Sequence, residues 1–435
     1  MIDITWAGRV PPHWEVVPLK SKFSFGKGLS ITKADLVDTG CPVLSYGQIH
    51  SKNNAKTGIV CELLRFVPDS ITDGCSESLA VKNGFIFADT SEDLDGCGNC
   101  NYVDQDGIYA GYHTVNLKPK TEENWKYLGY LFQTDAWRYQ LRKELTEVKL
   151  YSISQKALKS TVILVPPEDE RVAIVRFLDS KCAAIDEAIE RHKKIIEKLE
   201  EYRRQEIRRA VTKGIHDEPC KDSGIKWIGS IPESWRIAAI KRLAAIQTGN
   251  TPSKTEGNTY FDDHIGTPWI KPENLDSFDP IHKTTEYLTD DGISEARAFP
   301  AHTVFVCCIA SVGKVGYSDI ICSCNQQING LTFDQSKVFW KYGFYALIVA
   351  ADEHNAKANR SVQLIINSTQ QGFIKMPWPS IEEQIEIANY LDNACCAITN
   401  AIGKHSELIR KLEEYRKSII YHAVTGKIDC RKEAV

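Results

Sequence analysis

Two halves of the chain carry polar residues in segments rich in glycine, serine and asparagine, which are typical of loops. Glutamine and asparagine can pair with adenine in the major groove of DNA, and lysine can contact guanine. Backbone N–H groups in such turns suit phosphates. These residues predict a DNA-contacting surface in each half. The candidates are Lys27, Ser30, Ser45, Tyr46, Gln48, Tyr112 and His113 in the first half, and Thr248, Asn250, Thr251, Ser253, Lys254, Lys271, Asn274, Ser311, Lys314, Gln326 and Gln327 in the second.

No catalytic motif is recognisable. Gly313 and Lys314 resemble the end of a phosphate-binding loop, but Cys308 and Val315 stand where that motif needs glycine and serine or threonine. The sequence has no G-x-G-x-x-G, G-x-S-x-G or H-E-x-x-H pattern and no Asn-Pro-Pro-Tyr-like motif for adenine methylation. The acidic residues 92–95 are interpreted as a solvated turn. We expect a non-catalytic chain without a metal or cofactor of its own.

The composition is that of an ordinary globular protein of two to four domains. The chain has 435 residues, of which 43% are hydrophobic and 25% charged. Its 53 basic and 57 acidic side chains give a net charge of −4, so any DNA-binding face must be local. The 14 cysteines include one C-x-x-C pair but no second pair at zinc-ligand spacing. Without an apolar run long enough for a membrane helix, or a signal peptide, a cytoplasmic location is expected.

The sequence contains a long internal repeat. Trp6 and Trp14 return as Trp227 and Trp235, and residues 199–203 return unchanged as 412–416. The order is therefore a globular segment, a helical segment, and the same pair again, with boundaries at 1–165, 166–214, 215–378 and 379–435. Two copies of a two-part unit predict a molecule with approximate two-fold symmetry.

The two helical segments carry apolar residues at alternating spacings of three and four, which is a heptad seam. Ser380 with Glu383 forms a capping-box pattern, and Gly214 and Gly426 stand where helices end. One histidine interrupts each seam at the same position. It is either a polar layer that fixes register or a partly exposed histidine. The helix-pairing candidates are Leu178, Ile185, Ile189, His192, Ile196 and Leu199, with Leu391, Ile398, Ile402, His405, Ile409 and Leu412.

The globular segments are predicted to be loop-rich mixtures of helices and strands. Strands are expected at 85–87, 115–117, 162–165, 304–306 and 330–333, and helices near 125–145 and 340–355. Such domains present recognition residues on loops that a rigid scaffold holds.

In this order and duplication, the chain resembles the specificity subunit of type I restriction–modification enzymes over nearly all of its length. No single motif is decisive, and the resemblance depends on their order together with the repeat. The motifs are Ile231-Pro-x-x-Trp235, Thr248–Lys254, Trp269–Leu275, Ser311–Gly316, Asn325–Gln327, Pro379–Gln384 and Leu412–Arg416.

The resemblance implies a mixed α/β fold (α+β) with two target recognition domains, separated by two long helices that form an antiparallel coiled coil. Each domain would read one half of a split site on double-stranded DNA, and the helices would set the gap. Two modification subunits would dock on the helices and methylate adenine with S-adenosylmethionine. Restriction subunits would add translocation and cleavage driven by ATP and Mg²⁺, so the specificity subunit itself would not be catalytic.

The first globular segment departs from the family pattern. Residues 25–31 replace the Thr-Gly-x-Thr-Pro-Ser form, and residues 45–48 replace the Lys-x-x-Asn form. Because the two segments differ at these places, we expect an asymmetric DNA target. Two alternatives stay open: an assembly scaffold whose heads bind other ligands, which would not protect DNA, and an enzyme with an unrecognised site, which would turn over alone.

Overall fold

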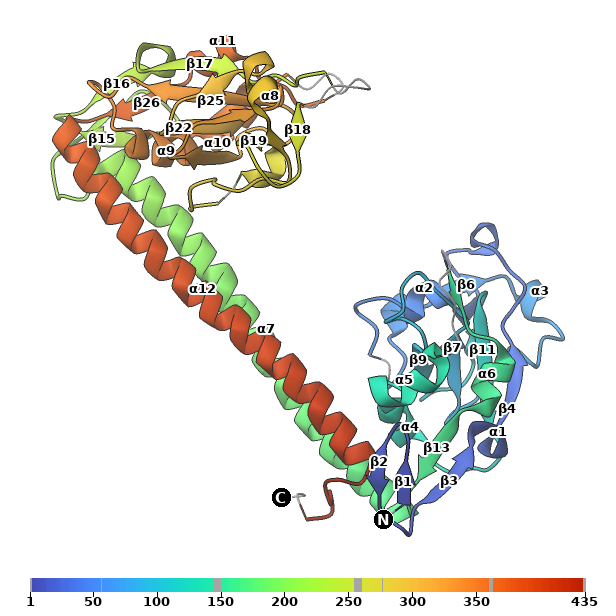
Figure 1. The fold of residues 1–435 in the computed structure, drawn as a ribbon. Helices are drawn as coiled ribbons and strands as arrows, with labels where there is room; N and C mark the ends of the chain where they lie inside the picture. Colours follow the sequence, from blue (N-terminus) through green and yellow to red (C-terminus); the bar gives the residue numbers. More distant parts are fainter. Residues whose placement is uncertain are drawn as a thin grey trace. The chain divides into compact units, whose positions relative to one another are not determined.

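The computed structural model describes residues 2–55, 57–143, 150–253, 260–275, 277–359 and 363–432 (Figure 1). The chain forms two compact units, Met1–Arg191 with Leu408–Val435 and His192–Glu407. Each unit holds one globular head, parts of two long helices and its own hydrophobic core. We call residues 2–165 head 1 and residues 215–378 head 2. Among the described residues, no helix combines the length and apolar character needed to cross a membrane.

Head 1 is built on a four-stranded antiparallel sheet of order β4-β11-β7-β9. A second sheet, β10-β5-β6, contains a parallel pair, β10 with β5. Its elements are β1 (Ile2–Ile4), β2 (Gly8–Val10), β3 (Glu15–Pro18), α1 (Leu19–Lys22), β4 (Phe23–Lys27), β5 (Cys41–Leu44), α2 (Tyr46–Ile49), β6 (Arg65–Val67), α3 (Asp69–Thr72), β7 (Phe85–Ala88), β8 (Thr90–Ser91), β9 (Cys100–Tyr102), β10 (Tyr109–Ala110), β11 (Thr114–Pro119), α4 (Lys126–Leu131), α5 (Asp135–Arg142), β12 (Tyr151–Ser152), α6 (Gln155–Ser160) and β13 (Val162–Val165).

Head 2 repeats this plan. Its four-stranded sheet has the order β17-β25-β22-β23, and its second sheet contains the parallel pair β19 with β24. Its elements are β14 (Cys220–Asp222), β15 (Ser230–Pro232), β16 (Arg236–Ala239), β17 (Ala244–Thr248), β18 (Phe261–Asp262), β19 (Thr267–Ile270), β20 (Tyr287–Leu288), α8 (Asp290–Glu295), β21 (Ala298–Phe299), β22 (Thr303–Cys307), β23 (Val315–Ser318), β24 (Cys322–Cys324), β25 (Ile328–Phe333), α9 (Trp340–Val349), α10 (Ala351–Lys357), α11 (Ser368–Gly372) and β26 (Lys375–Trp378).

The five predicted strands are present as β7, β11, β13, β22 and β25. The helical stretches predicted near 125–145 and 340–355 are each present as two helices, α4 with α5 and α9 with α10, and residues 144–145 lie outside the described residues. In head 1, the Thr134 hydroxyl accepts a hydrogen bond from the Trp137 N–H and starts α5 as a separate helix after α4. In head 2, the chain turns at Ala350 between α9 and α10.

The two long helices are α7 (Glu168–Lys213) and α12 (Ile381–Val424), and they pair antiparallel (Figure 1). Equivalent contacts occur in both units: Arg416 lies 3.6 Å from Asp186 in one, and Arg203 donates to Thr399 over 3.4 Å in the other. The predicted seam is buried at Leu178, Ile185, Ile189, Leu391 and Ile398, and half-buried at Ile196, Leu199, Ile402, Ile409 and Leu412.

The seam histidines face each other. The Nδ1 atoms of His192 and His405 lie 2.8 Å apart, and both rings are half-buried. One Nδ1 must therefore donate and the other accept, so the pair can carry no more than one extra proton while this bond is kept. Of the two interpretations of these residues, the polar layer is the one that the contact supports.

The predicted helix ends are confirmed at Gly214 and Gly426, which have φ of +74° and +69°. Only one of the two hydrogen bonds of the predicted capping box at α12 is present. The Ser380 hydroxyl accepts from the Glu383 N–H over 3.3 Å, but the Glu383 carboxylate instead accepts from the Trp235 indole N–H over 2.8 Å. The side chain that a capping box would use locally thus ties the helix to head 2.

Candidate nucleic-acid interface

Three loops of head 1 meet beside the start of β11. The Gly28 N–H donates to the Thr114 carbonyl over 3.1 Å, and the Gly111 N–H donates to the Leu44 carbonyl over 2.8 Å. These bonds bring together the loops that carry Lys27 and Ser30, Ser45 to Gln48, and Tyr112 with His113. The exposed members are Lys27, Ser30 and His113, and the half-buried ones are Tyr46, Gln48 and Tyr112.

An aromatic cluster lies at this meeting point. The Tyr46 ring centroid is 5.5 Å from that of Tyr112 and 5.4 Å from that of His113. His113 has a φ of +55°, a conformation that non-glycine residues adopt rarely and that is often found at functional sites. Its Nδ1 lies 3.5 Å from the Asp89 carboxylate. Head 1 thus presents aromatic rings and an imidazole.

Ser45 lies below this surface. Its side chain is 1% exposed, and its backbone N–H donates to the Gln48 amide oxygen over 3.1 Å. In this conformation Ser45 cannot reach DNA, and Gln48 has one end of its amide engaged with its own loop. The predicted roles of the other head 1 residues stay predictions.

The candidate loops of head 2 also come together. The Thr251 hydroxyl bonds to the Gln326 amide oxygen, and the Asn325 N–H donates to the Ile270 carbonyl over 3.1 Å. The Cys308 N–H donates to the Gln327 carbonyl over 2.7 Å, which joins the loop of Ser311 and Lys314 to this group. The exposed members are Thr251, Ser253, Ser311 and Gln326; the half-buried ones are Thr248, Asn250, Lys271, Asn274, Lys314 and Gln327; and Lys254 lies outside the described residues.

Several of these side chains already have partners within head 2. The Asn250 amide oxygen accepts from the Arg297 N–H over 2.6 Å, while its amide nitrogen donates to the Glu295 carbonyl over 2.9 Å. The Lys271 ammonium lies 2.5 Å from the Glu286 carboxylate, and the Asn274 side chain accepts from the Lys271 N–H. These residues therefore stiffen the loops as well as line them.

The structure adds residues that sequence reasoning missed. In head 1, the His50 imidazole bonds to the Thr90 carbonyl over 2.8 Å and to the Asn99 amide over 3.0 Å, which places it beside the aromatic cluster. In head 2, the exposed Arg297 guanidinium donates to the Thr248 carbonyl. The residues to which they bond lie 40 or more positions away in the sequence, so no local motif could reveal these contacts.

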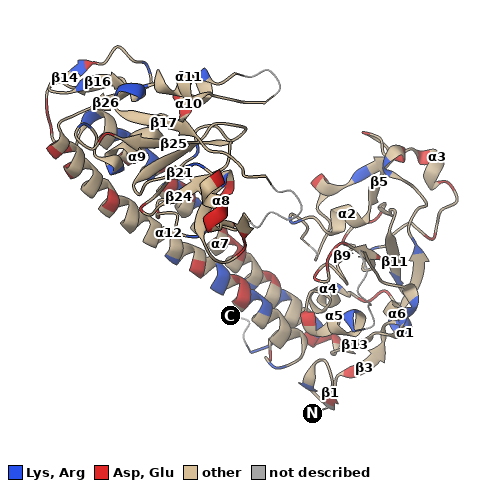
Figure 2. Ribbon diagram, turned by 45° about the horizontal axis from the view of Figure 1, so that its top comes forward, with Lys and Arg blue, Asp and Glu red and all other residues tan. Residues whose placement is uncertain are grey.

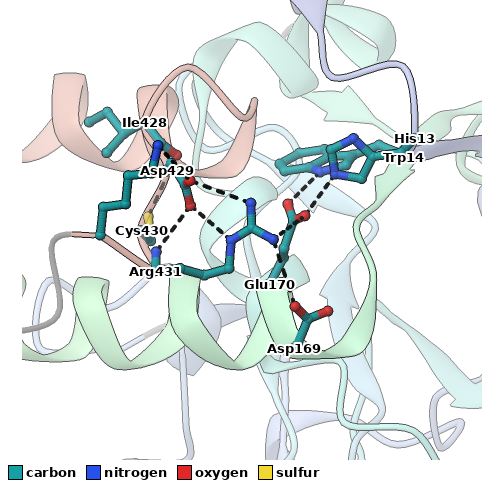
Figure 3. Close-up of polar contacts among 9 residues, drawn as sticks. His13, Trp14, Asp169, Glu170, Ile428, Asp429, Cys430 and Arg431 are labelled. Atoms are coloured by element: carbon teal, nitrogen blue, oxygen red, sulfur yellow. Dashed lines mark hydrogen bonds and ion pairs between the residues drawn. The ribbon is translucent and has the colours of Figure 1, made fainter.

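Each head is fastened to its helices by the same contact. In unit 1, the Trp14 indole donates to the Glu170 carboxylate over 2.8 Å, and His13 bonds to the same carboxylate over 2.7 Å (Figure 3). Arg431 adds ion pairs of 3.1 Å to Glu170 and 2.9 Å to Asp429. In unit 2, Trp235 makes the equivalent bond to Glu383. The repeated tryptophans of the sequence are thus anchors of the heads.

Charge is distributed without a basic block. In Figure 2, basic and acidic positions are interspersed along α7 and α12 and over both heads. The described part of the chain has no group of three or more His, Cys, Asp or Glu side chains that could hold a metal ion. Burial raises the pKa of the Cys308 and Cys322 thiols of head 2 to about 12, so these cysteines stay protonated and are poor nucleophiles.

Comparisons with known proteins agree on one family. The model of the type I restriction modification DNA specificity domain matches residues 11–201 and 232–408. A putative MjaX specificity subunit from Methanocaldococcus jannaschii is 23% identical over 98% of this chain and 96% of its own length. The HindI specificity subunit from Haemophilus influenzae is 33% identical over 25% of this chain and 23% of its own length.

Solved structures show the same fold. One, described as the basis of complex assembly and conformational transition of the type I R-M system, has a TM-score of 0.74 at 17% identity and covers 97% of this chain and 100% of its own. The HsdS subunit from Thermoanaerobacter tengcongensis has a TM-score of 0.54 at 16% identity, over 97% of this chain and 98% of its own. With the family model matching both heads, the chain belongs to the type I restriction–modification DNA specificity family, as a specificity subunit.

Proposed function

We propose that each head reads one half of an asymmetric bipartite site on double-stranded DNA. One observation carries this proposal: the two heads have the same fold, but their candidate DNA-contacting loops present different side chains. Head 1 offers Tyr46, Tyr112 and His113, whereas head 2 offers hydroxyl and amide groups such as Thr251 and Gln326. A duplicated scaffold with different side chains is what reading two different half-sites requires.

The long helices are proposed to dock two modification subunits and to set the gap between the half-sites. Exposed tyrosines support this role, because Tyr202 is 55% and Tyr415 is 52% exposed, and both belong to the segment that is repeated unchanged. Exposed aromatic residues are enriched at protein interfaces. Adenine methylation with S-adenosylmethionine would be carried out by the modification subunits. ATP- and Mg²⁺-dependent translocation and cleavage would be carried out by restriction subunits, all in the cytoplasm.

A methylome of the host with and without the gene tests the proposal. We expect one split motif to lose its adenine methylation on deletion, and that motif gives both half-sites and the gap. No change in any motif, with the modification subunit expressed and bound to this chain, would favour a scaffold that binds other ligands.

Glycine 28 gives a test confined to head 1. A Cβ at Gly28 would lie 1.9 Å from the Gly111 carbonyl oxygen and 2.4 Å from the Thr114 hydroxyl, so Gly28→Ala must displace the loop. Misplacement by about 1 Å can cost about 100-fold in rate, so we expect methylation of the cognate motif to fall by about that factor. Gly47→Ala is the matched control, because a Cβ at Gly47 meets nothing within 4 Å. Equal loss in both variants would contradict the prediction.

Helix length gives a test of the gap. Inserting whole turns of helix between Glu197 and Arg204, with a matching insertion in the facing part of α12, should lengthen the spacer of the methylated motif. We expect the bases of both half-sites to stay unchanged, since no candidate loop is altered. A methylome in which either half-site changes its bases would count against separate roles for heads and helices.

A further inference from the structure

A buried chain of hydrogen bonds runs through head 2 and ends at the candidate surface. His354 Nδ1 bonds to the Ala350 carbonyl over 2.8 Å, and its Nε2 lies 3.1 Å from the Gln371 amide nitrogen. The Gln371 amide oxygen accepts from the Asn329 amide nitrogen over 2.7 Å, and the Asn329 oxygen accepts from the Thr248 hydroxyl over 2.8 Å. His354, Gln371 and Asn329 are each 0% exposed, whereas Thr248 is half-buried.

The direction of every bond in this chain is fixed from its inner end. A carbonyl oxygen can only accept, so His354 must carry a proton on Nδ1. Burial lowers the pKa of His354 to about 4, so the ring is neutral and Nε2 offers a lone pair. Gln371 must therefore present its amide nitrogen to the ring, which turns its oxygen toward Asn329.

The same logic continues to the surface. Because Gln371 presents an oxygen, Asn329 must present its amide nitrogen, and its own oxygen then faces Thr248. An oxygen in that place can only accept, so the single hydroxyl proton of Thr248 is committed to Asn329. What Thr248 has left for an outside partner is its lone pairs.

This commitment restricts what Thr248 can contact. Phosphate oxygens and the N7 and O6 atoms of guanine have no proton to give, whereas adenine N6 and cytosine N4 are donors in the major groove. We infer that the His354–Gln371–Asn329 relay makes Thr248 an obligate hydrogen-bond acceptor, which selects adenine or cytosine, the bases with an amino group in the major groove, at one position of the strand that head 2 reads. The inference rests on the proposed function, and it assigns Thr248 a specificity role and the other three residues positioning roles.

The relay belongs to head 2 alone. Val115 is the counterpart of Asn329, because it pairs with Lys27 of β4 as Asn329 pairs with Thr248 of β17, and it is a buried apolar residue that cannot transmit a hydrogen bond. The residue 213 positions before Gln371 is Leu158, which is buried and cannot transmit a hydrogen bond. Head 2 therefore has three fully buried, hydrogen-bonded polar side chains that have no connected polar equivalents in head 1. Such a buried network indicates a function that is specific to head 2.

The test is a methylome of cells that carry the complete system with variant chains. Thr248→Val keeps the shape and removes the lone pairs, and we expect about a 10-fold loss of preference at one base pair of the head 2 half-site. Thr248→Ser keeps the hydroxyl and should keep the preference. Asn329→Leu frees the hydroxyl to donate, so guanine or thymine should become acceptable at that position.

The half-site of head 1 is an internal control, because a merely structural defect lowers methylation of all sites without changing any base. Thr303→Val is the matched variant, since it removes a buried hydroxyl of head 2 that bonds to the Pro300 carbonyl and Thr332. The inference is overturned if Thr248→Val leaves every base preference intact, or if a folded Asn329→Leu variant broadens no base preference in the half-site of head 2. If Asn329→Leu does not fold, the comparison of Thr248→Val with Thr248→Ser decides the test. Absence of any gene-dependent motif in wild-type cells would instead refute the proposed function.

Discussion

Trp235→Ala is expected to destabilise unit 2 by about 3–5 kcal/mol, the usual cost of deleting a large buried side chain. The Trp235 side chain is 1% exposed and packs in the core that joins head 2 to both helices of its unit. The substitution also leaves the Glu383 carboxylate without its indole donor, and burial already raises the pKa of that carboxyl. Losing the partner of this half-buried carboxylate adds to the cost.

Hydrogen exchange followed by mass spectrometry, in increasing urea, measures this effect separately in each unit. We expect peptides from residues 192–407 to lose protection at lower urea, with a smaller change in head 1. Trp235→Phe is the comparison variant, because it keeps a six-membered aromatic ring but removes the N–H and the rest of the indole, so we expect it to cost clearly less than alanine. If the alanine and phenylalanine variants lost the same stability, ring packing would not be the cause.

Much of the architecture follows from the sequence because a repeat and a heptad seam are long-range signals. The two long helices run for about 12 turns each. Regular apolar spacing along them leaves little freedom, and α7 and α12 lie where the spacing places them. Local signals were weaker. The Ser380 and Glu383 pattern predicts a capping box, but the structure shows Glu383 bonded to Trp235, 148 residues away in the chain. A capping pattern cannot show that a distant indole competes for the same carboxylate.

The candidate surface was harder to predict, for the same physical reason. Loop composition indicated the segments that meet in each head, but it could not show that Ser45 is buried or that Arg297 reaches Thr248. Those facts depend on how the loops fold onto the sheets. The relay was invisible in sequence as well, because His354, Gln371 and Asn329 come from α10, α11 and β25 and share no motif.

The two heads share the contact that holds them to the helices and differ in the residues behind their candidate loops. Both heads keep the tryptophan–glutamate anchor, because each must be held to a similar pair of helices. Behind the candidate loops the heads diverge, with aromatic rings around Tyr46 in one and a buried polar chain behind Thr248 in the other. The divergence therefore extends below the surface, into groups that orient the exposed side chains.

Acidification from pH 6.5 to 4 is expected to destabilise unit 2 by up to about 3 kcal/mol through His354 alone. The folded-state pKa of His354 is about 4, against an ordinary value of 6.5. Between these values the unfolded chain binds a proton that the folded chain does not, so stability falls as pH falls through this window, and the contribution is present in full above pH 6.5. A shift of one pKa unit corresponds to about 1.4 kcal/mol.

Urea unfolding of unit 2 at several pH values, measured by hydrogen exchange, checks this expectation through its slope. His354→Gln should flatten the dependence between pH 6.5 and 4, whatever it does to stability at neutral pH, and His264→Gln, in an exposed loop of the same head, should not. An unchanged slope in the His354 variant would contradict the prediction. Protonation would also turn Nε2 into a donor facing the Gln371 amide nitrogen, and two donors cannot bond. We therefore expect the Thr248 hydroxyl to be released from Asn329 over the same pH range in which head 2 loses stability. His354 would then affect both the stability of head 2 and its base preference.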